Sequence, residues 1–193
     1  AAATLPNSYN SVENITPLET PLSSTINGAA LATPVFLSLY AENDLRLDKY
    51  FAETDEKGFR KNKKAGSNNY LCTFRVGEIY LTAAEAAARL GELSQARTRL
   101  LELMRKRYAP EAYEAKSVVV NAMDKEALVQ EILDERAREL AFEGHRWFDL
   151  RRSTRPRLEK VLDGTRYVLE ENDARYTLAI PKEAIEANPG LLN

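Results

Sequence analysis

The chain has 193 residues, of which 44% are hydrophobic and 29% are charged, and its formal net charge is −2. Such values are ordinary for a soluble globular protein, and the charge balance gives no reason to expect nucleic acid or an acidic membrane surface as a partner. The single Cys72 excludes an internal disulfide, and no apolar run reaches the ~18 residues that a transmembrane helix needs.

We expect Cys72 to be a buried, unreactive thiol, because it stands at the start of an apolar run. No basic residue precedes Arg46, so the first residues are not expected to be a secretory signal.

Residues 1–35 differ in composition from the rest of the chain. They hold four of the eight prolines among many Ser, Thr and Asn residues, with only Glu13 and Glu19 charged. Proline lacks an N–H group, and Ser and Asn favour local turns, so this composition disfavours helices. The sequence predicts an irregular segment at 1–35 and a separate domain at 36–193.

A polar stretch at 56–70 contains five basic residues between Lys57 and Lys64. They could form a phosphate-binding patch. However, neither a phosphate-cradling glycine pattern nor interleaved aromatic residues accompany them, so the composition favours a solvated loop.

Helical periodicity begins at Phe74. Apolar residues recur at intervals of three and four on either side of Gly91, which predicts helices over 74–90 and 93–107. The spacing of a large aromatic residue, small residues and a turn glycine resembles one tetratricopeptide repeat. The residues that carry this resemblance are Tyr80, Ala84, Ala87, Gly91, Ala96 and Leu100. Such hairpins need neighbours, which must come from other helices here or from sequence outside the chain.

Two more helices and a β-hairpin are predicted in the last third of the chain. Asp124 is a credible N-cap for a helix over 124–143, and after Gly144 a short helix follows over 145–151. Two runs of β-forming residues flank Asn172-Asp173 and predict a hairpin within 166–180. A short helix should follow Pro181. The predicted fold class is mainly α, a tetratricopeptide-like helical hairpin domain with a small β-hairpin near the C-terminus.

The densest stretch is ELAFEGHRWFDLRR at 139–152, which contains the only His and the only Trp. Glu135, Glu139 and Glu143 are four residues apart and form one acidic stripe on a helix. Arginines at neighbouring positions could neutralise the stripe and pin the bend at Gly144 beside two aromatic rings. These arginines are Arg136, Arg138, Arg146, Arg151 and Arg152, and the rings are Trp147 and Phe148.

The same stretch could instead hold a catalytic acid/base pair, Glu139 and Glu143, of glycosidase type. Because both would share one helix face among arginines, we expect them to stay ionised and to have a structural role. A single His145 and a single Cys72 cannot assemble a zinc site, and nothing indicates a nucleophile–base pair. The structural motif therefore comprises Glu135, Arg138, Glu139, Glu143, Gly144, Arg146, Trp147, Phe148, Asp149 and Arg151.

These residues carry a resemblance to a known family. ERARELAFEGHRWFDLRR (135–152) resembles the signature of the SusD/RagB family of outer-membrane nutrient-binding lipoproteins. Three further stretches resemble family segments in the same order: NDLRLDKYF (43–51), FRVGEIYLTAAEAAARLGELSQA (74–96) and LAIPKEAIEANPGLLN (178–193). Family members are longer and begin with a lipidated cysteine, so the resemblance is to their C-terminal domain.

The resemblance implies a binding protein of the outer membrane and cell surface, with no catalysis and no cofactor. It implies a SusC-like TonB-dependent transporter as partner and an oligosaccharide, or in some members a peptide, as ligand. Ligand contacts vary within the family. From the residues alone, Asn7, Tyr9 and Asn10 are weak candidates for sugar binding, and their composition favours ordinary surface residues. A helical-repeat scaffold for a protein partner and a glycoside-processing enzyme remain as alternatives.

Overall fold

The structure, a computed structural model, describes residues 11–19, 31–64 and 70–192. The chain divides into two compact units, Ala1–Arg146 and Trp147–Asn193. In the described ranges no helix combines the length and the apolar character that crossing a membrane requires. The predicted division at residue 35 stays a prediction.

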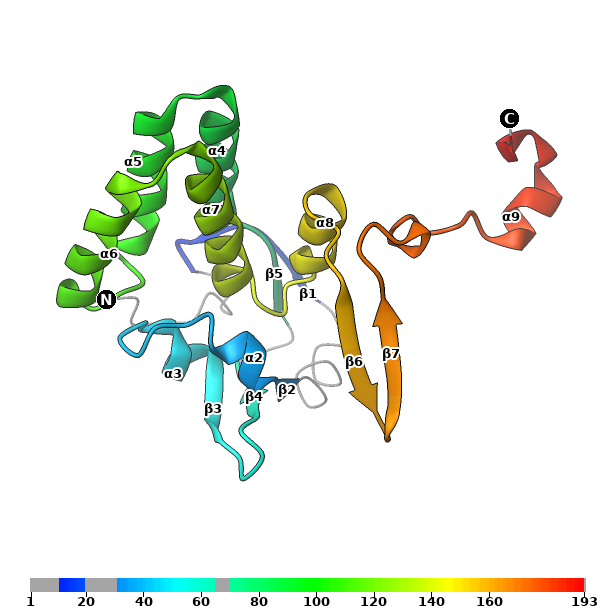
Figure 1. Cartoon of the computed structure of the whole chain (residues 1–193), viewed down its shortest axis with the longest axis horizontal. Helices are drawn as coiled ribbons and strands as arrows, with labels where there is room; N and C mark the ends of the chain where they lie inside the picture. The colour runs from blue at the N-terminus through cyan, green and yellow to red at the C-terminus, as the bar shows by residue number, and fades with distance from the viewer. Residues whose placement is uncertain (1–10, 20–30, 65–69, 193) are drawn as a thin grey trace. The chain divides into compact units, whose positions relative to one another are not determined.

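The first unit is mainly helical (Figure 1). Its long helices are α4 (Val76–Leu90), α5 (Leu93–Met104), α6 (Pro110–Ala122) and α7 (Lys125–Glu139). They follow one another in two antiparallel pairs, so the prediction of a mainly α fold built on a helical hairpin is confirmed.

The α4–α5 hairpin has the predicted turn and the predicted small-residue seam. Gly91 adopts φ 88°, a left-handed conformation that favours glycine, and the N–H of Glu92 reaches back to the carbonyl of Ala87 at 2.9 Å. Ala84, Ala88 and Ala96 are completely buried. Their small side chains let the two helix backbones approach closely.

Helix α6 was not predicted from the sequence. Pro110 stands at its first turn, where a missing N–H costs nothing, but Val120 is the only residue of the helix that is buried. With so little burial, the helix has no clear apolar periodicity. Asp124 caps α7 as predicted, accepting the N–H of Ala127 at 2.9 Å, and α7 ends at Glu139 rather than at 143.

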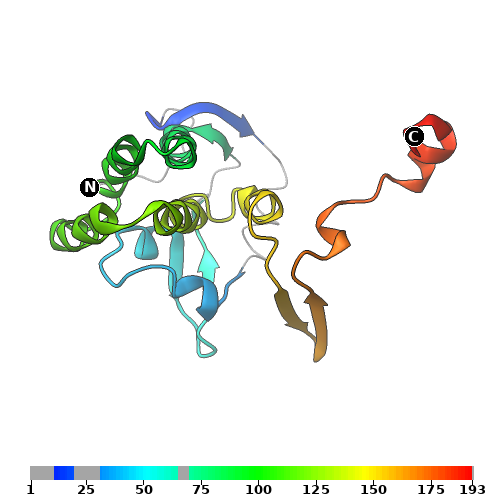
Figure 2. The same ribbon diagram turned by 45° about the horizontal axis from the view of Figure 1, so that its top comes forward.

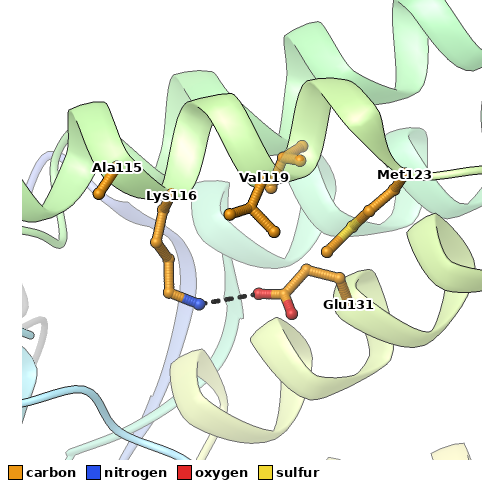
Figure 3. Close-up of a pocket in the computed structure, with 6 residues that line it drawn as sticks. Ala115, Lys116, Val119, Met123 and Glu131 are labelled. Atoms are coloured by element: carbon orange, nitrogen blue, oxygen red, sulfur yellow. Dashed lines mark hydrogen bonds and ion pairs between the residues drawn. The ribbon is translucent and has the colours of Figure 1, made fainter.

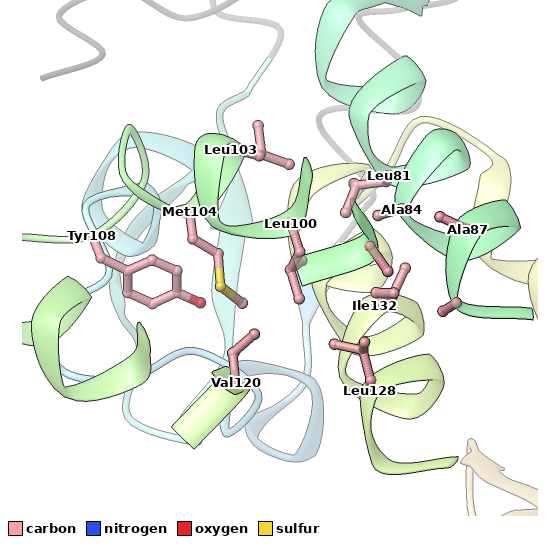
Figure 4. Packing of buried hydrophobic residues seen from close by; sticks show 12 residues of the cluster. Leu81, Ala84, Ala87, Leu100, Leu103, Met104, Tyr108, Val120, Leu128 and Ile132 are labelled. Carbon is pink, nitrogen blue, oxygen red and sulfur yellow. The ribbon is translucent and has the colours of Figure 1, made fainter. Parts of the chain in front are cut away.

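The core of the first unit lies among these four helices. Figure 4 shows the side chains of Leu81, Leu100, Leu128 and Ile132, which are fully buried. Burying a leucine or isoleucine side chain contributes about 1.5–3 kcal/mol, so this cluster is a major source of stability for the unit.

A small three-stranded sheet and two short helices complete this unit. The strands are β2 (Leu31–Ala32), β3 (Phe51–Thr54) and β4 (Arg60–Asn62), in the antiparallel order β2-β4-β3. The helices are α2 (Pro34–Leu37) and α3 (Arg46–Tyr50). A second apolar cluster packs here, in which the rings of Phe36, Tyr40, Phe51 and Phe142 meet edge to face.

Strand β1 (Asn14–Glu19) pairs antiparallel with β5 (Tyr70–Arg75), as Figure 2 shows in blue and teal. The prediction of an irregular segment over 1–35 was therefore wrong for β1, for β2 and for the start of α2. Backbone pairing to a distant strand overrode the local composition. The side chain of Cys72, which was predicted to be buried, lies outside the described residues.

The second unit contains most of α8 (His145–Arg152) and a hairpin of β6 (Leu158–Leu162) and β7 (Thr165–Leu169). The hairpin was predicted within 166–180, and that position was wrong. Its turn is Asp163-Gly164, with φ 49° and 76°, the two positive values of a type I′ turn.

The rest of this unit consists of short helical turns. Asn172-Asp173 leads instead into a 3-10 turn, η1 (Ala174–Tyr176), which the Asp173 side chain caps. The helix predicted after Pro181 is α9 (Lys182–Ala187), and η2 (Pro189–Leu192) follows it.

Candidate functional site

The acidic stripe predicted on α7 is buried. Glu135 and Glu139 have no exposed surface, and only 7% of the Glu143 side chain is exposed. Glu135 and Glu139 lie in the last turns of α7, and Glu143 lies in the turn that follows. Burying three carboxylates would be very unfavourable without partners, so the arrangement depends on the cations around them.

Glu139 is the centre of the resulting ion-pair cluster. Its carboxylate accepts hydrogen bonds from the guanidinium groups of Arg46 at 2.9 Å, Arg75 at 2.5 Å and Arg107 at 2.9 Å. Arg46 belongs to α3, Arg75 ends β5, and Arg107 follows α5. Three segments far apart in the sequence therefore meet at one side chain.

The two other glutamates extend the cluster. Glu135 accepts from Arg46 at 2.7 Å, from Arg138 at 2.8 Å and from the hydroxyl of Tyr108 at 3.1 Å. Asp44 binds the opposite edge of the Arg46 guanidinium through two hydrogen bonds. Each charge in this part of the cluster therefore faces an opposite charge.

Glu143 binds Arg75 and, through a very short contact, Lys64. Lys64 also donates to the carbonyl of Glu139 at 2.6 Å and to that of Ala141 at 3.2 Å, and Arg75 donates to the Glu139 carbonyl at 2.5 Å. The Glu139 carbonyl is at the C-terminal end of α7, where a helix leaves its last acceptors unsatisfied, and the Ala141 carbonyl lies in the turn that follows. The same cations therefore neutralise the glutamates and cap the helix.

The electrostatics keep these glutamates ionised. Burial by itself raises the pKa of Glu139, but the guanidinium groups of Arg107, Arg75 and Arg46 outweigh it and hold the pKa well below its ordinary value. The pKa of Glu143 is likewise lowered, because Lys64 and Arg75 outweigh its burial. A general acid needs a raised pKa, so neither carboxyl group has a proton to donate near neutral pH.

The structure separates the predicted motif into two groups. Arg138 lies in the cluster, pairing with Glu135 as predicted, whereas Arg146 is exposed at the start of α8. Gly144 has φ 86° at the bend. Trp147, Phe148, Asp149 and Arg151 belong to the second unit.

In that unit Trp147 stacks on Tyr176, with ring centroids 5.2 Å apart. Asp149 is buried and accepts from Arg152 at 2.7 Å, the Arg151 carbonyl accepts from Arg155, and Phe148 is 61% exposed. Trp147, Asp149 and Arg151 of the predicted motif therefore make contacts within the second unit, whereas Phe148 is largely exposed.

The prediction that arginines of the same stretch neutralise the glutamates was incomplete. Glu139 and Glu143 are bound by Arg46, Lys64, Arg75 and Arg107, none of which lies on α7. Lys64 was expected in a solvated loop and is instead buried. Two of the missed cations had a sequence signal, because Arg46 and Arg75 lie in the segments 43–51 and 74–96 that resemble family motifs.

A small pocket lies between α6 and α7 (Figure 3). Its volume is about 220 Å³, and apolar side chains of Ala115, Val119 and Met123 line it. Its two charged groups, Lys116 and Glu131, are paired with each other at 3.2 Å. Ligand pockets are usually larger, ~300–1,000 Å³, and offer polar groups that are not already paired. The pocket therefore lacks the features of a sugar site.

The predicted sugar-binding candidates Asn7, Tyr9 and Asn10 lie outside the described residues. Among the described ones, large aromatic side chains with substantial exposure are Phe74 at 42%, Phe148 at 61% and Tyr167 at 56%. Aromatic rings of this kind can stack on the apolar face of a sugar.

The sequence profile of the SusD family matches residues 30–193. Among solved structures, a SusD superfamily protein from Bacteroides thetaiotaomicron aligns with a TM-score of 0.66 at 22% identity, covering 92% of this chain and 47% of the other. One from Bacteroides fragilis aligns with a TM-score of 0.59 at 23% identity, covering 89% of this chain and 37% of the other. A SusD-like carbohydrate binding protein from Bacteroides vulgatus aligns with a TM-score of 0.55 at 19% identity, covering 81% of this chain and 40% of the other.

The chain thus spans less than half the length of these solved relatives. No curated protein matches it. At such identities the structural likeness establishes the fold, which agrees with the family profile over most of the chain. By its profile match and its fold, the chain belongs to the SusD family.

Proposed function

We propose that the chain is the C-terminal part of a cell-surface nutrient-binding protein that captures glycans. The observation that carries the proposal is membership of the SusD family over residues 30–193, together with the fold it shares with a carbohydrate binding protein from Bacteroides vulgatus. Because the chain spans less than half of its solved relatives, the ligand and partners of the whole protein are part of the proposal.

The role is binding, without catalysis and without a cofactor. The only carboxylate pair that the sequence offered for glycoside hydrolysis, Glu139 and Glu143, is buried and held ionised by arginines and a lysine. An inverting or retaining mechanism needs one protonated carboxyl group that can reach the glycosidic oxygen. The described site cannot supply it.

The family membership also supports a place and a partner. We propose that the full-length protein is lipid-anchored at the outer membrane and faces outward. There it would pass oligosaccharides to a SusC-like TonB-dependent transporter. The described chain contributes the helical unit and the C-terminal unit to that assembly.

Binding residues are proposed on exposure and chemistry alone. Phe148 and Tyr167 present aromatic rings to solvent in the second unit, whereas Trp147 is occupied by its stack on Tyr176. Asn7, Tyr9 and Asn10 stay candidates from the sequence. Stacking of a sugar on an aromatic ring typically accompanies hydrogen bonds from amide groups such as those of Asn7 and Asn10.

Two alternative ligands belong to the same proposal. A peptide could replace the glycan, as the resemblance already implied. A protein partner is favoured by one observation, the second helical pair α6–α7 beside α4–α5, since stacked helical pairs commonly form binding surfaces.

Calorimetry against matched oligosaccharide and peptide panels tests the proposal, using this chain and the full-length protein that contains it. We expect the full-length protein to bind an oligosaccharide, and the chain alone to bind it weakly or not at all, because part of the ligand surface lies outside it. Equal, strong binding by the chain would place the site within these residues. Tyr167→Ala, with Val161→Ala at a 62% exposed position of β6 as the control, would then test the exposed ring.

Binding of peptides alone would favour the alternative ligand. Release of reducing sugar by the full-length protein would contradict the non-catalytic role.

A further inference from the structure

The ion-pair cluster has one edge formed by the N-terminal strand. We name residues 11–19, which contain β1, the strap. Glu13 of the strap accepts two hydrogen bonds from Nη2 of Arg107, at 2.9 and 2.8 Å, and its carboxylate lies 3.6 Å from Nη1 of Arg75. The backbone N–H of Val76 donates to the Glu13 carbonyl at 2.9 Å. The strap thus covers two of the three arginines that hold Glu139.

Glu13 differs from the other anions that bind these arginines in its exposure to solvent. Its side chain is 29% exposed, whereas Glu139 is fully buried and Glu143 is 7% exposed. The arginines under it are almost completely buried, Arg75 at 1% and Arg107 at 5%. At this edge, therefore, the Glu13 carboxylate stands between bulk water and two buried guanidinium groups.

The strap is held by its ladder with β5 and by the ion pairs of Glu13. Among the described strands, β1 pairs with β5, in a two-stranded sheet whose register is irregular at two places, around Thr16 and Pro17. Two of the strap's apolar side chains lie largely outside the core, since Val12 is 96% exposed and Ile15 is 47% exposed. Two-stranded sheets are marginally stable by themselves. Opening of the strap should therefore require much less free energy than opening of the helices, whose side chains form the core.

We propose that the strap is a releasable cover over an anion site formed by Arg75 and Arg107, and that this site takes a carboxylate-bearing ligand. Glu13 is its resident occupant. Guanidinium groups stay charged at every accessible pH and bind carboxylates through paired hydrogen bonds, so an outside carboxylate can make the contacts that Glu13 makes now. Glu139 keeps one side of each guanidinium fixed. The proposal is independent of the proposed glycan binding.

Hydrogen exchange on the wild-type chain tests the release, with acetate as the probe and chloride at equal ionic strength as the reference. If acetate competes with Glu13, the strap spends more time open, and amides of the β1–β5 ladder exchange faster in acetate. Amides in the middle of α4 serve as the internal control and should not change. Equal exchange in both salts, or strap amides as strongly protected as those of α4, would overturn the proposal.

A variant tests the site itself. Glu13→Ala removes the resident carboxylate, so acetate should raise the melting temperature of this variant by more than that of the wild type. Glu102→Ala is the matched control, because Glu102 pairs with Arg99 at 3.1 Å on the exposed face of α5. Equal acetate shifts in all three proteins would contradict the site. If Glu13→Ala does not fold, the exchange experiment decides alone.

Discussion

Glu139 shows how a carboxylate can be fully buried in a small helical unit. Removing a charge from water costs several kcal/mol, and the surroundings compensate only when the partners are close and well oriented. Here three guanidinium groups lie within 2.5–2.9 Å of one carboxylate. Replacing any single member would leave the other charges buried without a full set of partners.

At the same scale, Gly77 has no room for a side chain. A Cβ at this position of α4 would lie 2.7 Å from Nη1 of Arg75 and 2.9 Å from a carboxylate oxygen of Glu139. Both atoms are held by the cluster and cannot move away freely. We expect Gly77→Ala to destabilise the first unit by about 1–3 kcal/mol, measured by urea unfolding.

The control for Gly77→Ala is Ala83→Gly at an exposed position of the same helix. It should cost about 1 kcal/mol, because glycine is a poor helix former. By helix propensity alone, Gly77→Ala would stabilise the protein, though by less, because Gly77 lies in the first turn of α4. An increase in stability would therefore contradict the close packing of the cluster against α4.

The cluster also predicts a loss of stability in acid. The pKa values of Glu135, Glu139 and Glu143 are lowered in the folded state, because neighbouring cations outweigh the effect of burial. Their contribution is fully present above the ordinary value of 4.5 and is lost as the pH falls below it. The free energy of unfolding, measured from pH 7 downwards, should fall below about pH 4.5, and less steeply in Glu139→Gln. Identical acid profiles for both proteins would count against this explanation.

The sequence predicted the glutamates of the cluster but only part of their surroundings. The four-residue spacing of Glu135, Glu139 and Glu143 is visible on a helix, and so is Arg138 three positions after Glu135. Arg107 and Lys64 arrive through tertiary structure, and no local spacing connects them to α7. Single-sequence reasoning therefore assigned the buried Lys64 to a solvated loop.

At the scale of elements, sequence signals worked where local chemistry decides the structure. Gly91 and Asp124 were placed correctly because a left-handed turn and an N-cap each have a residue preference of their own. Helix α6 was missed because it buries little and so lacks periodicity. For the hairpin, the prediction rested on the β-forming runs around Asn172 alone, although Asp163-Gly164 is a residue pair that two-residue hairpin turns prefer.

That turn can be tested directly. Gly164 has φ 76°, and no atom lies within 4 Å of a Cβ added there, so the cost of a side chain is conformational. We expect Gly164→Ala to destabilise the hairpin by about 1–2 kcal/mol. Gly164→Asn should cost less, because asparagine tolerates this conformation.

The readout for Gly164→Ala is the fluorescence of Trp147, the only tryptophan, which stacks on Tyr176 in the same unit. Thermal unfolding curves that coincide for the wild type and both variants would show that the turn does not contribute to the stability of this unit.

At the scale of the whole molecule, the cluster connects parts of the first unit that share little apolar contact. It joins α3, β5 and α7 with the residues that precede β1, follow β4 and follow α5. The four long helices have their own core, whereas the sheet segments depend on aromatic packing and on these ion pairs. The stretch that resembles an active site in the sequence thus supplies the glutamates through which these elements are connected.

The most direct test of this account is urea unfolding of Glu139→Ala beside the wild type and Glu102→Ala, followed by far-UV circular dichroism. Removing the central carboxylate leaves Arg46, Arg75 and Arg107 incompletely paired, and we expect a loss of about 2–4 kcal/mol. Glu102→Ala, which breaks an exposed pair, should change the stability by less than about 0.5 kcal/mol. A denaturation midpoint of Glu139→Ala equal to that of the wild type would contradict the structural role of the cluster.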